Sequence, residues 1–265
     1  MFSDRRLSHG NTHSCLSCHD IGSNGASANA NDTPEGQPTA LNTPTVFNAS
    51  LSFRLNWEGN IRSLEEGIER SLGNPAIMAS SLGEVTSKLR ADPEMVKQFR
   101  EAYGEEPNGA AILDAIATYE RSLVTPGSRF DRWLLGETDA ITPEELAGYQ
   151  IFKSLGCVAC HQGINVGGNM FQRHGVFHPL GSPEPVLLRV PSLRNVAATA
   201  PYFHDGSATT LSEAVKSMGI AQLDRVLTDQ QISAIVAFLN TLTGTYRGEV
   251  IMPAAARPRA GTVRQ

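Results

Sequence analysis

Two Cys-x-x-Cys-His segments are the part of this chain best suited to chemistry. They span Cys15–His19 and Cys157–His161, and together they use all 4 cysteines of the sequence. In this pattern each cysteine pair can form thioether bonds to one haem, and the adjacent histidine can bind the iron. A thioredoxin-like redox pair or a zinc site also uses such cysteines, but a redox pair does not explain the histidine in both copies. We therefore expect two covalently attached haem c groups, held by Cys15, Cys18, His19, Cys157, Cys160 and His161.

The second motif lies between two segments with strong helix signals. Thr142–Glu145 forms a capping box with a proline in the first turn, and the predicted helix ends at Gly156, directly before Cys157. A second capping box, Thr228–Gln231, starts a run with apolar residues at helical spacing that ends at Gly244. A helix leading into the motif and a closing helix form the layout of small class I cytochromes c.

The first half shows a looser version of the same pattern. Residues 111–123 predict its closing helix, with apolar side chains on one face. Residues 131–136 are interpreted as the hinge between the halves. Residues 21–45 and 163–190 are rich in Gly, Asn, Pro and Ser and are predicted to be loops. No strand-rich region is evident.

Length and composition agree with two haem domains. The chain has 265 residues, which suits two domains of ordinary size, predicted here as residues 1–135 and 136–265. A net charge of −5 gives no indication of nucleic-acid binding. No apolar run reaches the roughly 18 residues that a membrane span needs.

The first residues carry no basic segment and no apolar segment of the kind found in secretory signals. Covalent haem attachment in bacteria takes place outside the cytoplasm. We therefore expect a periplasmic protein whose signal peptide is absent from this chain. The alternative is a cytoplasmic protein with unmodified cysteines.

Met218 is the candidate for the second axial ligand of the second haem. It lies shortly before the closing helix, in a segment predicted to be a loop. A thioether ligand favours ferrous iron and raises the reduction potential. The alternative is that Met218 simply fills the core, which is the commoner role of methionine.

Several segments together resemble the bacterial di-haem cytochrome c peroxidases. They cover nearly the whole chain in the same order and precede the Met218 segment: Phe2–Ser8, Asn42–Asn48, Asn56–Gly59, Asn74–Met78, Gly163–Gly168, Pro191–Asn195 and Thr199–Gly206. The family's usual first helix, upstream of Phe2, is absent from this sequence. The resemblance implies a mainly α fold of two cytochrome c-like domains, with the haems near the domain interface.

The resemblance also implies a direction of electron flow. A small donor protein, a cytochrome c or a cupredoxin, would reduce the high-potential C-terminal haem, which is ligated by His161 and Met218. Electrons would then reach the low-potential haem at His19, where hydrogen peroxide is reduced. Trp57 matches a tryptophan between the haems, although composition alone would place it in the core. Arg194 matches an arginine beside a haem propionate.

The resemblance further implies a calcium ion between the domains. Its ligands match the Asn42 side chain and the carbonyl oxygens of Thr199 and Pro201, and oxygen donors suit this cation. Without the resemblance, these residues would be interpreted as ordinary loop residues. A homodimer is expected by family analogy.

The sequence departs from the family at the first haem. There is no histidine between His19 and His161, although family members usually place an iron ligand there. Ile77 stands where the family has a glutamate, and Gly67 stands at the position of a glutamine. General acid–base groups contribute on the order of 10²–10⁴-fold in rate, so peroxide turnover is expected to be weakened. His9 and His13 lie near the motif, but loop histidines are more often solvated than iron-bound.

Three functions are compatible with these residues. The first is a cytochrome c peroxidase, which the resemblance favours. The second is a non-catalytic di-haem cytochrome that acts in redox or small-ligand sensing, which the lost Glu and Gln favour. The third is long-range oxidation of a partner protein, as in relatives that mature the methylamine dehydrogenase cofactor. Those relatives replace the methionine found here at position 218, so this function ranks last.

Overall fold

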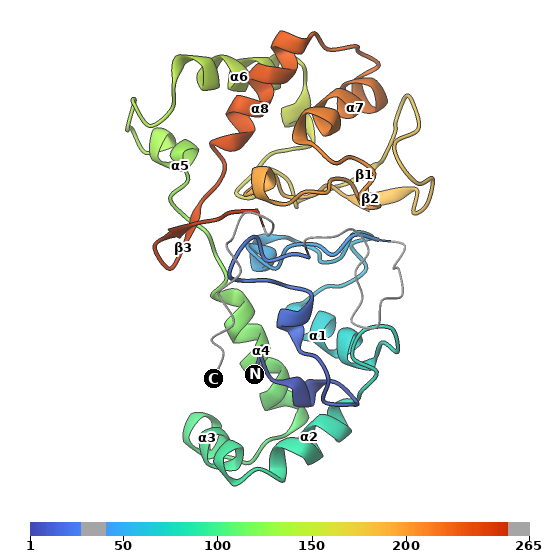
Figure 1. Cartoon of the computed structure of the whole chain (residues 1–265), viewed down its shortest axis with the longest axis vertical. Helices are drawn as coiled ribbons and strands as arrows, with labels where there is room; N and C mark the ends of the chain where they lie inside the picture. The colour runs from blue at the N-terminus through green and yellow to red at the C-terminus, as the bar shows by residue number, and fades with distance from the viewer. Residues whose placement is uncertain (28–40, 254–265) are drawn as a thin grey trace, which may run out of the picture.

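The chain folds into two mainly helical lobes joined end to end (Figure 1). The computed structural model describes residues 1–27 and 41–253. One lobe contains the first four α-helices and the other contains the last four (Figure 1). The α-helices are α1 Leu64–Gly73, α2 Leu82–Arg90, α3 Pro93–Tyr103, α4 Gly109–Arg121, α5 Arg129–Leu134, α6 Pro143–Ser154, α7 Leu211–Leu223 and α8 Asp229–Asn240.

Short elements complete the fold. One-turn 3₁₀ helices cover Arg5–Leu7, Cys15–Ser17, Ala49–Leu51, Cys157–Ala159 and Val196–Ala198. Strands β1 (Phe171–Arg173) and β2 (Leu187–Arg189) form one antiparallel pair, and β3 (Thr245–Tyr246) and β4 (Glu249–Val250) form another. The mainly α prediction is therefore confirmed.

The first lobe is built around the packing of α1 on α4. Ser63 caps α1 by accepting a hydrogen bond from the backbone of Glu66, and Asn108 caps α4 in the same way. The apolar faces of the two helices are buried together in one core, which contains Leu64, Ile68, Leu72, Ile112 and Ile116. The predicted helix over 111–123 is thus confirmed, with both ends displaced by two residues toward the N-terminus.

The second lobe is built around the packing of α6 on α8. Both predicted capping boxes form, at Thr142 and at Thr228. Gly148 of α6 lies so close to α8 that a Cβ atom there would sit 1.9 Å from the carbonyl oxygen of Ala234. The two helices therefore cross at a distance that only glycine allows.

Three local predictions from the sequence need correction. Residues 131–136, expected as a hinge, belong mainly to α5, whose Phe130 and Trp133 stack on each other and pack in the second core. The loop predicted over 163–190 contains the β1–β2 pair. Met218 lies within α7, because the capping box at Thr210 starts a helix that the sequence reasoning did not identify. The part of the predicted 21–45 loop at 28–40 lies outside the described residues.

The end of the described chain returns to the first lobe. Ile251 is buried in the first core, and the ring of Tyr246 lies 5.1 Å from that of Phe47. The first lobe therefore includes residues from the C-terminal end of the described chain. The second lobe includes α5, which lies before the predicted domain boundary at residue 135.

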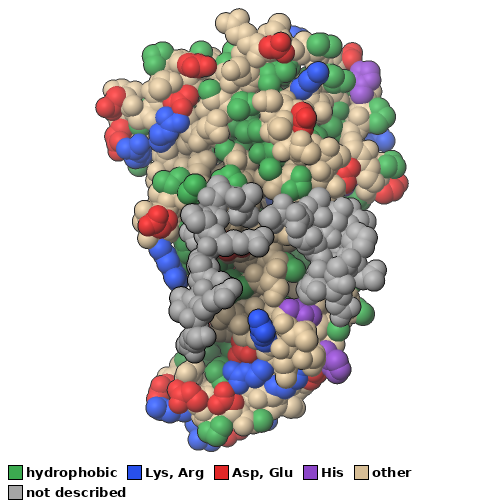
Figure 2. Space-filling model, viewed as in Figure 1, with side chains coloured by type: hydrophobic (Ala, Val, Ile, Leu, Met, Phe, Trp, Pro, Cys, Tyr) green, Lys and Arg blue, Asp and Glu red, His purple; other side chains and the backbone are tan. Residues whose placement is uncertain are grey.

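The visible surface carries acidic and basic side chains interspersed on both lobes, without a broad face of one sign (Figure 2). Within residues 1–27 and 41–253, no helix combines the length and apolar composition needed to cross a bilayer.

Candidate haem cavity and domain interface

One continuous cavity of about 1080 Å³ connects the two Cys-x-x-Cys-His segments. Both histidines of the motifs and all four cysteines line it. Its remaining walls come from both lobes, so the cavity runs across the domain interface. The structure thus brings the two motifs to a single space although they are far apart in sequence.

The backbone around His19 leaves one ring nitrogen available to a metal. Its Nδ1 lies 3.2 Å from the carbonyl oxygen of Gly25, which can only accept, so Nδ1 carries the proton. Burial lowers the pKa of His19, and the ring is therefore neutral. A neutral imidazole fixed through Nδ1 presents the Nε2 lone pair, as histidine ligands of metals generally do.

His161 has a similar environment. Burial lowers its pKa to about 4, although nearby carbonyls of Val166 and Pro191 oppose the shift. Its buried Nδ1 makes no hydrogen bond of good geometry in the described structure. Gly167 permits this crowding, because a Cβ there would lie 2.1 Å from the oxygen of Pro191. The backbone carbonyls of Val166 and Pro191 are the acceptors nearest to this ring in their effect on its pKa.

The cysteines are arranged alike in the two motifs. A 3₁₀ turn begins at the first cysteine, and the backbone N–H of each motif histidine donates to the carbonyl of that cysteine. No disulfide joins the four cysteines. Burial raises the pKa of Cys15 to about 12 and that of Cys157 to about 11, so both are neutral thiols. Two thiols and one available imidazole nitrogen on the wall of a large cavity fit one haem c at each motif.

A sequence model described as di-haem cytochrome c peroxidase matches residues 1–139, and a cytochrome c model matches residues 146–243. This chain belongs to the di-haem cytochrome c peroxidase family. Family membership implies two haem c groups, in agreement with the duplicated geometry of the motifs.

Relatives of this peroxidase family extend the match along the chain. Cytochrome c551 peroxidase of Nitrosomonas europaea is 40% identical over 261 residues, which cover 92% of this chain and 78% of that protein. Cytochrome c peroxidase Ccp of Escherichia coli is 37% identical over 265 residues, but this chain spans only 57% of it. The crystal structure of a MauG-like protein associated with microbial copper homeostasis superposes with a TM-score of 0.79 at 26% identity, covering 92% of this chain and 87% of that one.

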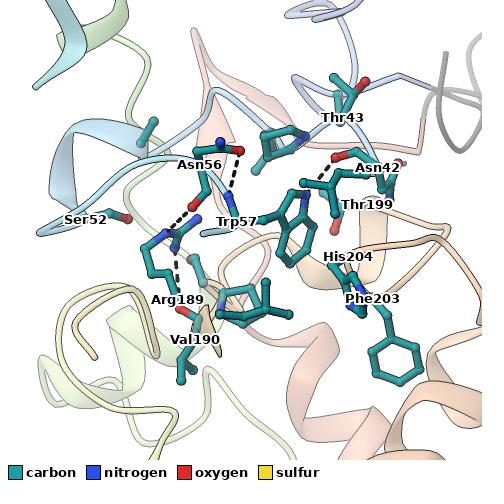
Figure 3. Close-up of a pocket in the computed structure, with 18 of the residues that line it drawn as sticks. Asn42, Thr43, Ser52, Asn56, Trp57, Arg189, Val190, Thr199, Phe203 and His204 are labelled. Atoms are coloured by element: carbon teal, nitrogen blue, oxygen red, sulfur yellow. Dashed lines mark hydrogen bonds between the residues drawn. The ribbon is translucent and has the colours of Figure 1, made fainter. Parts of the chain in front are cut away.

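Trp57 lines the cavity at the interface of the lobes (Figure 3). Its Nε1 donates to the carbonyl oxygen of Asn42 at 2.7 Å, and its own carbonyl accepts from the backbone of Arg189 at 2.8 Å. The indole also faces the ring of His204, with centroids 6.4 Å apart. Hydrogen bonds to residues of both lobes therefore hold this aromatic side chain in place.

The three residues expected to bind calcium are brought together beside Trp57. Asn42 is buried, and its side-chain amide lies 2.8 Å from the carbonyl oxygen of Pro201. Thr199 lines the same part of the cavity (Figure 3). In the described ranges, no group of three or more His, Cys, Asp or Glu side chains could hold a metal ion.

Arg194, expected to lie near a propionate of the second haem, is paired with Asp131 in this structure. Its guanidinium makes two hydrogen bonds to Asp131, at 2.8 and 2.9 Å, and it does not line the cavity. Arg189, which the sequence reasoning missed, lines the cavity instead.

The wall near the first motif is largely apolar. Ile77 and Gly67 both line the cavity, as their positions in the family pattern suggested. Met218 lines the part of the cavity that belongs to the second lobe. His13 also lines the cavity, but Thr12 and the Ile77 carbonyl engage its two ring nitrogens. His9 is exposed and pairs with Glu84.

Glu120 is an ionisable cavity residue that the sequence reasoning did not identify. It lies near the end of α4 and lines the cavity. Burial raises its pKa to about 7, and the charge of Glu65 adds to the shift while Arg121 opposes it. The apolar spacing of α4 could have indicated its inward direction, because position 120 follows Ile116 by one helical turn.

Proposed function

We propose that this chain is a periplasmic di-haem cytochrome that reduces hydrogen peroxide with electrons from a small donor protein, a cytochrome c or a cupredoxin. The observation that carries the proposal is the shared cavity, in which two buried, neutral histidines and two cysteine pairs flank Trp57. We place the lobes at residues 1–135 and 136–265, although the packing of α5 favours a slightly earlier boundary. A homodimer is proposed by family analogy.

Each residue has a defined task in this proposal. When bound, haem iron supplies the redox chemistry, and the overall reaction consumes one peroxide, two electrons and two protons to give two waters. His161 and Met218 would hold the second iron and set a high potential. His19 would hold the first iron, in the part of the cavity that Ile77 and Gly67 line. Trp57 would lie on the electron route between the two sites.

The proton supply is the weak point of the reaction. Ile77 and Gly67 carry no group that could donate or accept a proton. Glu120 is the remaining described carboxyl on this wall with a pKa near neutrality, where general acid–base groups work best. We therefore propose a slow peroxidase in which Glu120 supplies part of the missing acid–base function.

We also propose that calcium binds between the lobes at Asn42, Thr199 and Pro201. The Asn42 side chain would have to turn its amide oxygen toward the ion, and the Pro201 carbonyl would then exchange a hydrogen bond for the cation. Assignment of amide oxygen and nitrogen follows the hydrogen-bond network, and a bound ion would reverse that preference. Neutral carbonyl and amide oxygens are accepted ligands of Ca²⁺.

A second function, small-ligand binding without turnover, is supported by the same apolar wall. With no histidine between His19 and His161, the first haem would have no loop imidazole competing with a small molecule. Such a protein would bind ligands and pass electrons but would reduce peroxide no faster than free haem.

The test is rapid mixing of the half-reduced protein with peroxide, followed in the Soret band, after haem content has been measured. Two covalent haems per chain and rapid loss of the one reducing equivalent of the half-reduced protein on addition of peroxide would support the peroxidase. His19→Ala should abolish the reaction, while His178→Ala, on the exposed surface, should not change it. Two haems with ligand binding but no peroxide consumption would support the sensing function, and fewer than two haems would refute both.

A further inference from the structure

Thr125 lies in the connection between α4 and α5, where the chain passes from one lobe to the other (Figure 1). Its side chain is buried, and its hydroxyl oxygen accepts hydrogen bonds from two buried side-chain amides. Nδ2 of Asn48, in the first lobe, donates at 2.8 Å, and Nδ2 of Asn195, in the second lobe, donates at 2.9 Å. A hydroxyl oxygen has two lone pairs, so the two lobes share one oxygen atom and occupy both of its acceptor sites.

The two asparagines have the same local geometry. Each has a positive φ, 58° at Asn48 and 60° at Asn195, and each precedes a one-turn 3₁₀ helix. The backbone N–H of Asn48 donates to the carbonyl oxygen of Leu123, two residues after α4, at 2.8 Å. The backbone N–H of Asn195 donates to the carbonyl oxygen of Leu242, two residues after α8, at 3.1 Å. The same arrangement is therefore present once in each lobe.

The repeat also brings the segments after α4 and α8 into contact. The side-chain oxygen of Asn48 accepts from the backbone N–H of Thr125 at 2.9 Å. The side-chain oxygen of Asn195 accepts from the backbone N–H of Gly244 at 2.9 Å. A Cβ atom at Gly244 would lie 2.1 Å from the carbonyl oxygen of Thr125, so only glycine permits this approach. The two copies of the arrangement thus meet at Thr125.

Each asparagine is also close in sequence to a residue that contacts a motif histidine. Pro44 lies four residues before Asn48, and Pro191 lies four residues before Asn195. Burial lowers the pKa of both motif histidines, and hydrogen bonding to the carbonyls of these two prolines opposes the shift. Short backbone segments therefore join Thr125 to both histidines expected to bind iron.

We propose that Thr125 is a positioning residue that fixes the two haem sites relative to each other, because its hydroxyl oxygen is the shared acceptor of both lobes. The inference rests on the proposed function in assuming that electrons pass between two haems. Loss of the oxygen would leave two buried amide N–H groups without an acceptor, one in each lobe. Because such unsatisfied donors are unfavourable, the lobes would move until the amides found new partners.

Two further asparagines cross the interface and provide the competing explanation. Asn24, in the loop after the first motif, donates to the carbonyl oxygen of Ala198 at 2.7 Å. Asn165, in the loop after the second motif, donates to the carbonyl oxygen of Asn48 at 3.2 Å. If these contacts alone fix the lobes, loss of the Thr125 hydroxyl would lower stability without changing the separation of the haem sites.

The experiment compares the wild-type holoprotein with Thr125→Val, which removes the hydroxyl, and Thr125→Ser, which keeps it. Thr241→Val is the control, because Thr241 is also buried but its hydroxyl donates to the Phe238 carbonyl within the second lobe at 2.6 Å. The reduction potentials are measured by spectroelectrochemical titration. A pulse of reductant then shows how fast an electron given to the low-potential haem reaches the high-potential haem, without peroxide. Hydrogen exchange is followed by mass spectrometry in peptides that contain Asn48 and Asn195.

We expect Thr125→Val to slow interhaem transfer while both potentials stay unchanged, and Thr125→Ser to restore the wild-type rate. Hydrogen exchange in Thr125→Val should accelerate in both peptides by about tenfold or more, the effect of an unsatisfied buried donor. Thr241→Val should leave the interhaem rate and the exchange of the Asn48 peptide unchanged.

Several outcomes would overturn the inference. An unchanged interhaem rate in Thr125→Val would show that Asn24 and Asn165 fix the lobes, and an equally slow Thr125→Ser would show that the hydroxyl is not the cause. Should Thr125→Val not fold, Asn195→Gly decides, because glycine accepts the positive φ and removes one of the two amides. A wild-type rate in Asn195→Gly would then refute the inference. A wild-type protein without two haems would refute the proposed function instead, and accelerated exchange confined to one lobe would still contradict the shared contact.

Discussion

Glu120 offers a direct test of the wall beside the first haem motif. Its pKa is raised to about 7 from an ordinary value of 4.5, because burial and the charge of Glu65 disfavour the ionised carboxylate. The folded protein therefore loses stability as this group is forced to ionise. Glu120→Gln keeps the shape of the side chain and removes the titration.

The pH dependence of the free energy of unfolding follows from the difference between the folded and unfolded pKa of Glu120. Because the folded pKa is above the unfolded one, the native state suffers no penalty below about pH 4.5. The penalty grows as the pH rises and is complete above about pH 7. A difference of about 2.5 pKa units corresponds to roughly 3 kcal/mol as an upper limit, at about 1.36 kcal/mol per unit. Glu120→Gln should therefore be increasingly more stable than wild type between these two pH values, with a plateau above.

The measurement is urea unfolding of both proteins from pH 4 to pH 8, with Glu101→Gln as a control on the exposed face of α3. Glu101→Gln should not become more stable than wild type as the pH rises. If the stability difference between wild type and Glu120→Gln is flat across this range, Glu120 is solvated in the protein. Glu120 would then have no raised pKa and would not be suited to the proposed acid–base role.

Four further predictions concern other parts of the structure. Met218→Ala should lower the potential of the second haem and remove the weak absorption near about 700 nm of a ferric His/Met haem, and an unchanged spectrum would make Met218 a core residue. Asn42→Ala should reproduce the effect of a chelator on melting and interhaem electron transfer, and insensitivity to both would disprove the calcium site. Gly148→Ala should destabilise the second lobe by about 3 kcal/mol or more in chemical denaturation, because its Cβ would meet backbone, while Gly73→Ala should be tolerated since nothing lies within 4 Å. Ile77→Glu should raise the rate of peroxide reduction in stopped-flow assays, by roughly 10²–10⁴-fold at most, and an unchanged rate would show that proton transfer is not limiting.

The helices that frame the motifs were predictable because their signals are local. The capping boxes at Thr142 and Thr228 and the apolar spacing of α4 determine helix starts and faces within a few residues. The error at Met218 came from reading its segment as a loop, although Thr210 and Glu213 form the same kind of box. The expected hinge became α5 because Phe130 packs into a core formed by residues far along the chain.

The cavity could be predicted only in part, for a related reason. The expected haem-binding residues could be identified because each motif consists of five consecutive residues. The partners of Arg194, Arg189 and Glu120 depend instead on which side chains face each other after the lobes pack, and no spacing in the sequence reports that. The expected roles of Trp57, Asn42 and Arg194 rest on the family resemblance, and the pairing of Arg194 with Asp131 could not be derived from either segment alone.

The proposed electron route and the proposed proton supply use different residues. The proposed electron route uses His161, Met218 and Trp57, and hydrogen bonds to Asn42 and Arg189 hold Trp57 at the interface. The changes at Ile77 and Gly67 are confined to one wall in the first lobe. Electron delivery should therefore be intact while peroxide cleavage is slowed, so the reduced second haem should be oxidised at a rate set by the first site. A protein with fast interhaem transfer and slow peroxide consumption would fit this separation, whereas slow transfer in the unmodified protein would place the defect at the interface instead.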